Sequence, residues 1–127
     1  MSLSPAAKQR YARQILLREI GEEGQARLLH ARFGRDESSD SQAYGRAADY
    51  LRRAGCAEDC SAEPLRVPSS QSVDAFAGGE PRYREAAATV LGSLSAVEFL
   101  KDALELPKGG ELPRNLTLLG KQAKRPC

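Results

Sequence analysis

Residues 81–106 read PRYREAAATVLGSLSAVEFLKDALEL, and they predict the longest helix of the chain. Apolar residues recur there at helical spacing and form one broad face. These residues are Ala87, Val90, Leu91, Leu94, Val97 and Leu104. Gly92 and Ala96 are one turn apart, and such small residues let a second backbone approach closely, although the glycine costs about 1 kcal/mol of helix propensity. We therefore expect this helix at the centre of the core, with a neighbouring helix crossing it near Gly92.

The N-terminal third predicts two entry helices within residues 1–33. The first begins after Ser4, an acceptable N-cap residue, and runs to about Ile20, where Gly21 stops it. Its expected apolar stripe consists of Tyr11, Ile15, Leu16 and Leu17. The second covers about 22–33 and carries two glutamates in its first turn, where the helix dipole favours acidic residues.

A polar loop is expected over residues 34–41, because GRDESSDS has no apolar periodicity. The next helix runs from about Asp40, which suits an N-cap, to Ala54, and Gly55 terminates it. One face of this helix has the i, i+3, i+4, i+7 spacing of buried residues. That face consists of Tyr44, Ala47, Ala48 and Leu51.

The remaining chain offers weaker signals. Residues 56–79 are rich in Ser, Pro and Gly, and only 65–67 and 72–76 are able to form short strands. A last strand at 116–119 and a mobile basic tail at 121–125 are expected within 107–127. The sequence therefore predicts a single, mainly α domain over 1–127. It has a helical core over 42–106, four to five helices and at most two or three short strands.

Composition narrows the functional classes. The net charge is only +2, from 19 basic and 17 acidic residues interspersed along the chain, so no field favours nucleic acid. No run approaches the roughly 20 apolar residues that span a bilayer, and no secretory signal is evident. We expect no membrane partner and a cytoplasmic location. Three cysteines make a disulfide framework a poor interpretation.

Several segments together resemble the ThiF/MoeB/HesA adenylyltransferases, which activate small ubiquitin-like sulfur carriers. RYARQILLREIGEEGQARLL (10–29) resembles the entry helices of that family, and AADYLRRAG (47–55) resembles the helix after its nucleotide loop. GEPRYRE (79–85) resembles its GEPCYRC segment, and VLGSLSAVEFLK (90–101) resembles its closing helix. The matches occur in the order of the family and cover about half of the chain. The resemblance implies a remnant of a Rossmann-like fold.

The departures from the family remove its chemistry. Where the family has a strand running into G-x-G-x-x-G, this chain reads RFGRDESSDSQAYG (32–45), and its glycines are too far apart to cradle phosphates. A deletion after Gly55 removes the segment that holds the ribose-binding acid, the phosphate-binding residues and the magnesium-binding Asp of the family. Arg82 and Glu85 replace the first pair of zinc cysteines. We therefore expect no catalytic residue, no cofactor and no metal.

Despite these departures from the family, four residues are candidates for a part in nucleotide binding or thiol chemistry. Arg13 matches the arginine that the family sends across a dimer interface to the partner's nucleotide, so the resemblance implies a phosphate contact in trans, with a solvated surface arginine as the alternative. Cys127, near Lys121, Lys124 and Arg125, is a candidate for thiol chemistry or an inert terminal thiol. Cys56 and Cys60, one turn apart if helical, are weaker thiol candidates. The acidic residues Asp36, Glu37 and Asp40 are interpreted as solvated loop carboxylates.

The function that follows is protein interaction without catalysis. The resemblance implies self-association, or docking on a ThiF/MoeB-type activating enzyme or a ubiquitin-like carrier in cofactor biosynthesis. Helices that once covered a parallel sheet expose apolar faces when the sheet is lost, so a homodimer is a natural solution. The alternative is a composite site in which Arg13 or Cys127 contributes to nucleotide or sulfur-transfer chemistry. A small helical domain with an unrelated role is the third possibility.

Overall fold

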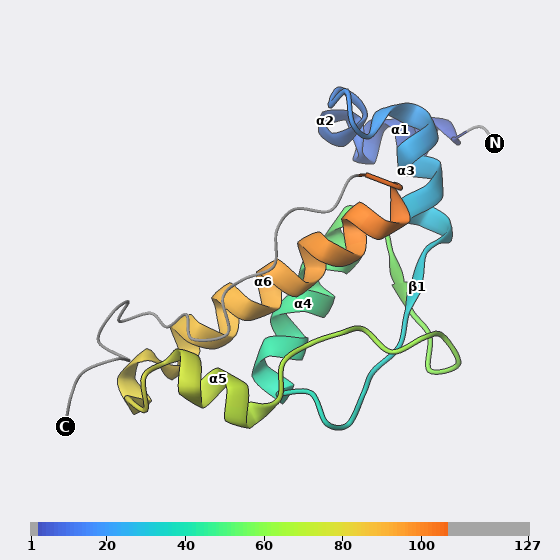
Figure 1. Cartoon of the computed structure of the whole chain (residues 1–127). Helices are drawn as coiled ribbons and strands as arrows, with labels where there is room; N and C mark the ends of the chain where they lie inside the picture. Colours follow the sequence, from blue (N-terminus) through green and yellow to red (C-terminus); the bar gives the residue numbers. More distant parts are fainter. Residues whose placement is uncertain (1–2, 107–127) are drawn as a thin grey trace.

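The computed structural model describes residues 3–106, and these residues form a mainly helical structure (Figure 1). Its elements are the helices α1 (Pro5–Arg10), α2 (Ala12–Ile15), α3 (Gly21–His30), α4 (Ser41–Ala54), α5 (Ser70–Phe76) and α6 (Arg84–Ala103), the 3-10 helix η1 (Pro81–Tyr83), and the strands β1 (Arg32–Phe33) and β2 (Ala57–Glu58). The prediction of a small, mainly α domain is confirmed. The strand and tail expected within 107–127 lie outside the described residues.

Helices α4 and α6 form the centre of the fold, running side by side in the same direction (Figure 1). Each contributes a ridge of buried residues at intervals of four, the spacing at which helix surfaces interlock. The two ridges are Ala43, Ala47 and Leu51 on α4, and Ala88, Gly92 and Ala96 on α6. A Cβ atom added at Gly92 would lie 2.4 Å from the carbonyl oxygen of Ala43. The expected crossing at Gly92 is therefore confirmed.

The buried face of α6 is narrower than the sequence indicated. Ala87, Ala88 and Ala96 are fully buried, whereas Val90 and Leu94 are 38% and 37% exposed. Because α6 approaches α4 through small residues, the contact is close and narrow, and the two larger residues face away from it. The prediction that Val90 and Leu94 belong to the core face is wrong.

The two strands form a parallel pair joined by α4, which makes a β-α-β unit. Arg32 pairs with Ala57, and Phe33 pairs with Glu58. The Phe33 side chain is fully buried, with its ring centroid 6.4 Å from that of Tyr44. The second helix therefore ends at His30 and not at Phe33, as was expected from the sequence.

The N-terminal segment also differs from the prediction. The expected helix over 5–20 is divided at Tyr11 into α1 and α2, and α2 already ends at Ile15. The division buries Tyr11 and brings its ring to the C-terminal end of α4, where it lies near Gly55. Leu16 is 85% exposed and Leu17 is 52% exposed, so the predicted apolar stripe is wrong at these two residues.

Residues 56–79 contain a helix that the sequence did not indicate. α5 replaces the strand expected at 72–76, with Ser69 as its N-cap and with Val73 and Phe76 buried one turn apart. Residues 65–67 form no strand either. The chain beside them is extended, and its bridge to the sheet joins Gly34 with Pro64.

The boundaries of α4 agree with the sequence prediction. The Asp40 side chain accepts a hydrogen bond from the N–H of Ala43, and Gly55 adopts a φ of 113° at the C-terminal end. Two side-chain amides then complete this end, because the Nε2 atoms of Gln14 and Gln25 donate to the carbonyl oxygen of Ala54 at 3.2 and 3.0 Å. Gln25 is fully buried, so α2 and α3 are fastened to α4 by a polar contact inside the core.

Replacement of Gly92 by alanine should destabilise the domain, although alanine is the better helix former. The new methyl group meets the backbone of α4, and such overpacking costs about 1–3 kcal/mol. Gly45→Ala is the matched control: it lies in the interior of α4 with no atom within 4 Å of the added Cβ, so it should stabilise by up to about 1 kcal/mol. Urea denaturation measures both variants. Equal gains in stability would contradict the close α4–α6 contact.

Candidate functional site

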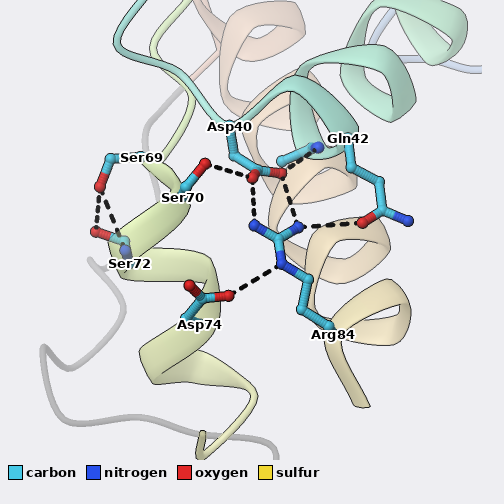
Figure 2. A network of polar contacts seen from close by, with 8 residues as sticks. Asp40, Gln42, Ser69, Ser70, Ser72, Asp74 and Arg84 are labelled. Atoms are coloured by element: carbon cyan, nitrogen blue, oxygen red, sulfur yellow. Dashed lines mark hydrogen bonds and ion pairs between the residues drawn. The ribbon is translucent and has the colours of Figure 1, made fainter. Parts of the chain in front are cut away.

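Three helices begin at one buried carboxylate, that of Asp40 (Figure 2). Its Oδ2 atom accepts the N–H of Ala43 in the first turn of α4 at 2.8 Å. Its Oδ1 atom accepts the hydroxyl of Ser70, the first residue of α5, at 2.9 Å. Arg84, the first residue of α6, donates to both carboxylate oxygens. We call Asp40, Ser70, Asp74, Arg84 and Gln42 the Asp40 junction.

Within the junction, the Arg84 guanidinium donates hydrogen bonds to three side chains, those of Asp40, Asp74 and Gln42. Its Nε atom donates to Asp74 at 3.0 Å, and its Nη1 atom donates to the Gln42 amide oxygen at 3.1 Å in addition to Asp40. Asp40 is 2% exposed, while the Arg84 side chain is partly covered. Each polar group therefore has a partner in place, which is the condition under which a buried charge is tolerated.

The electrostatics of the junction oppose acid–base catalysis. Hydrogen bonding by Arg84 is the main cause that lowers the pKa of Asp40 to about 2, with smaller contributions from Ala43 and Ser70, while burial acts in the opposite direction. The same hydrogen bond raises the pKa of Arg84 above its usual value. Both groups stay charged near neutral pH, far from the pKa range that suits proton transfer. The junction therefore acts as a structural ion pair.

A cavity of about 460 Å³ lies beside the junction. Its lining consists of Asp74, Ala77, Gly79, Glu80, Pro81 and Arg84. The charged side chains already have partners, since Asp74 binds Arg84 and Glu80 lies 3.7 Å from Arg82. Each carboxylate in the lining therefore lies beside an arginine.

A second cavity, of about 380 Å³, opens between α2, α4 and α6, and we call it the groove. Its lining consists of Gln14, Arg46, Asp49, Tyr50, Arg53, Ala54 and Ser93. Large apolar side chains are exposed on the same three elements or just after them. These are Leu16, Leu17, Tyr50, Val90 and Leu94, and together with the groove they form what we call the groove face.

Arg13 lies on α2, directly before the groove residue Gln14. Its side chain is exposed, and it forms no ion pair with another residue of the 3–106 range. It therefore lies on a helix that contributes to the groove, and it is not one of the residues of the Asp40 junction. Its assignment to a nucleotide in trans remains a prediction.

The two described cysteines do not form a common site. Cys56 is buried and Cys60 is exposed, both thiols are free, and strand β2 lies between them, so the helical turn that would align them is absent. Burial raises the pKa of Cys56 to about 11, which disfavours the reactive thiolate. Residues 3–106 contain no cluster of three or more metal-binding side chains. Cys127 lies outside the described residues.

The two positions that correspond to zinc cysteines in the family are engaged in other contacts. Arg82 lies 3.7 Å from Glu80, and Glu85 lies 3.2 Å from Arg46. Comparisons with protein-family models, curated proteins and solved structures found no match. The resemblance to the ThiF/MoeB family therefore stays a prediction. Within the described part of the chain, no helix is both long enough and apolar enough to cross a membrane.

The prediction of Asp40 as an N-cap is confirmed, but its interpretation as a solvated loop carboxylate is wrong, because the side chain is buried in the junction. The bond partner Arg84 is 44 positions away, and no local pattern connects the two. The sequence did not predict that Val90 and Leu94 are exposed, because their spacing also fits a buried helix face. A narrow ridge of small residues, Ala88, Gly92 and Ala96, was the available signal that the core face lay elsewhere.

Asp40→Asn should lower stability by about 2 kcal/mol at neutral pH, because it removes a carboxylate whose pKa is depressed from 3.8 to about 2. The depressed pKa means that the stabilisation is present above about pH 4 and is lost as the pH falls toward 2. Urea denaturation from pH 7 to pH 2 should therefore show a smaller acid-dependent loss in the variant. Asp49→Asn, which breaks an exposed pair with Arg53, should change stability by less than about 1 kcal/mol.

Cys60 should react with iodoacetamide much faster than Cys56 in the folded protein at pH 7.5. Cys60 is exposed at a turn, whereas Cys56 is buried and has a raised pKa. Peptide mass mapping after short exposure separates the two sites, and denaturation in urea should equalise their rates. Rapid labelling of Cys56 under native conditions would contradict its placement in the core.

Proposed function

We propose that this chain functions by binding another protein through the groove face. The observation that carries the proposal is the exposure of Tyr50 (45%) in the groove lining, together with that of Leu94 (37%) on α6 and Leu16 (85%) directly after α2, two helices that also contribute to the groove. Single exposed apolar residues are common, but a group of them around a concave surface is typical of an interaction site. The site therefore favours a binding protein over an enzyme.

The charged groups of the Asp40 junction are paired with one another, and this pairing supports a role without catalysis. Asp40 and Arg84, the most deeply placed ion pair of the described residues, use their hydrogen-bonding capacity on each other and on neighbouring helices. The resemblance to the ThiF/MoeB family suggests three candidate partners. They are a second copy of the chain, a ThiF/MoeB-type activating enzyme, and a ubiquitin-like sulfur carrier in cofactor biosynthesis.

A composite nucleotide site is the second candidate function, and the exposure of Arg13 favours it. A guanidinium held by no described carboxylate is free to bind a phosphate of a partner's nucleotide in a bidentate manner. In this version the partner supplies the nucleotide loop, and Arg13 or the thiol of Cys127 supplies a group in trans. The two functions predict different effects of Arg13→Ala.

Co-purification of the tagged chain from its own host, with ATP and magnesium present, tests the proposal. Leu16→Asp with Leu94→Asp should remove the bound protein, because each substitution places a charge on an apolar contact. Gln71→Asp, an exposed substitution on α5 outside the groove face, should retain it. Loss on Arg13→Ala only when ATP is present would favour the composite site.

Sedimentation velocity of the purified chain separates self-association from docking on another protein. A concentration-dependent dimer that the Leu16→Asp and Leu94→Asp double variant dissolves would identify a second copy as the partner. Retention of every bound protein by the double variant, with its fold intact by circular dichroism, would refute the groove face as the binding surface.

A further inference from the structure

We propose that the groove face binds a protein surface that presents acidic side chains among apolar residues. This inference rests on the proposed function and adds the chemical class of the partner. It follows from the two arginines that line the groove, from the weak ion pairs that these arginines form, and from the exposed apolar side chains on the helices that line it.

The groove is lined by two arginines from one face of α4. Arg46 and Arg53 are seven positions apart, which is close to two turns and about 10 Å along the helix. Asp49 is the one carboxylate in the lining. Arg13, which directly precedes the lining residue Gln14, is exposed without an ion pair to another described residue. The lining therefore has two arginines against one carboxylate, and an unpaired arginine precedes it in the sequence on α2.

The ion pairs of the groove arginines are easily exchanged. Arg46 lies 3.2 Å from Glu85, and Arg53 lies 3.2 Å from Asp49. All four side chains are about half exposed or more, and pairs of this kind contribute about 0–1 kcal/mol. An incoming carboxylate can therefore take over the guanidinium at small cost. By contrast, Arg84 is enclosed in the Asp40 junction and is not available to a partner.

Exposed apolar side chains on the two long helices that line the groove add to the effect of such an exchange. Tyr50 lies in the lining, and Val90 and Leu94 lie on α6 one turn before and one residue after Ser93. A partner that covers these residues removes water from the arginines, and a charge pair is stronger when water is excluded. The combination selects a surface with both apolar residues and carboxylates.

The same charges disfavour two occupants from the chain itself. A second copy that docks groove to groove about a two-fold axis offers only one lining carboxylate, Asp49, to two lining arginines. The sequence beyond the described residues is also basic: it contains Lys108, Arg114, Lys121, Lys124 and Arg125 against Glu111. An acidic partner is therefore favoured over either of them.

Three fluorescent amphipathic peptides test the proposal, each about four helical turns long, with the same leucine stripe and with Glu, Gln or Lys at the polar positions. Fluorescence anisotropy with the full chain measures their affinities. We expect the Glu peptide to bind at least tenfold more tightly than the Gln peptide, and to lose that advantage at about 0.5 M salt. The Lys peptide should bind most weakly.

Arg46→Gln with Arg53→Gln should abolish the preference for Glu, so that the Glu and Gln peptides bind this variant with the same affinity. Arg52→Gln is the matched control, because Arg52 is an exposed, ion-paired arginine of the same helix that does not line the groove. This variant should keep the preference. Thermal unfolding of all variants confirms that the fold is retained.

The other outcomes are distinct from one another. Equal binding of the Glu and Gln peptides, lost on Leu94→Asp, would overturn the acidic partner and leave the proposed function standing. Failure of all three peptides to bind, together with a dimer that Leu94→Asp dissolves, would make a second copy the occupant and overturn the inference. Failure of every peptide with a monomeric chain would overturn both proposals.

Discussion

The close approach of α4 and α6 at Gly92 is the constraint on which the rest of the structure depends. The backbone of α4 occupies the place of the missing side chain, and alanines on both helices keep the axes close along the contact. The small residues leave no width for larger apolar groups between the helices. Bulky residues of α6 consequently point elsewhere: Phe99 lies against Phe33, Leu91 packs on the cluster around Val73, and Leu94 is exposed to solvent.

The Asp40 junction fixes how the helices align along this contact. α4 and α6 run in the same direction, so their N-terminal ends, which carry partial positive charge, lie together with that of α5. The buried carboxylate at this meeting point accepts hydrogen bonds from the N–H of Ala43, the hydroxyl of Ser70 and the Arg84 guanidinium at once. The short-range packing at Gly92 and the charge at Asp40 thus act at different points of the same interface.

The sequence predicts those features whose signal is local. Asp40 as an N-cap, Gly55 as a helix terminator and Gly92 as a crossing point each depend on one residue type in a helical pattern, and all three are confirmed. β1 and β2 have two residues each, too few to show alternation, and α5 has only seven. The Asp40–Arg84 pair and the exposed flank of α6 depend on tertiary placement, which no single-chain pattern encodes.

The parallel pairing of β1 and β2 also has a consequence for how the domain assembles. Antiparallel strands can be closed by a hairpin, but a parallel pair needs a crossover, and here the crossover is α4 itself. Bringing the two strands together costs conformational entropy, because the whole of α4 lies between them. This cost is offset only when α4 has packed against α6 and the core. The small sheet and the helix pair should consequently form and melt together, as one cooperative unit built on non-local contacts.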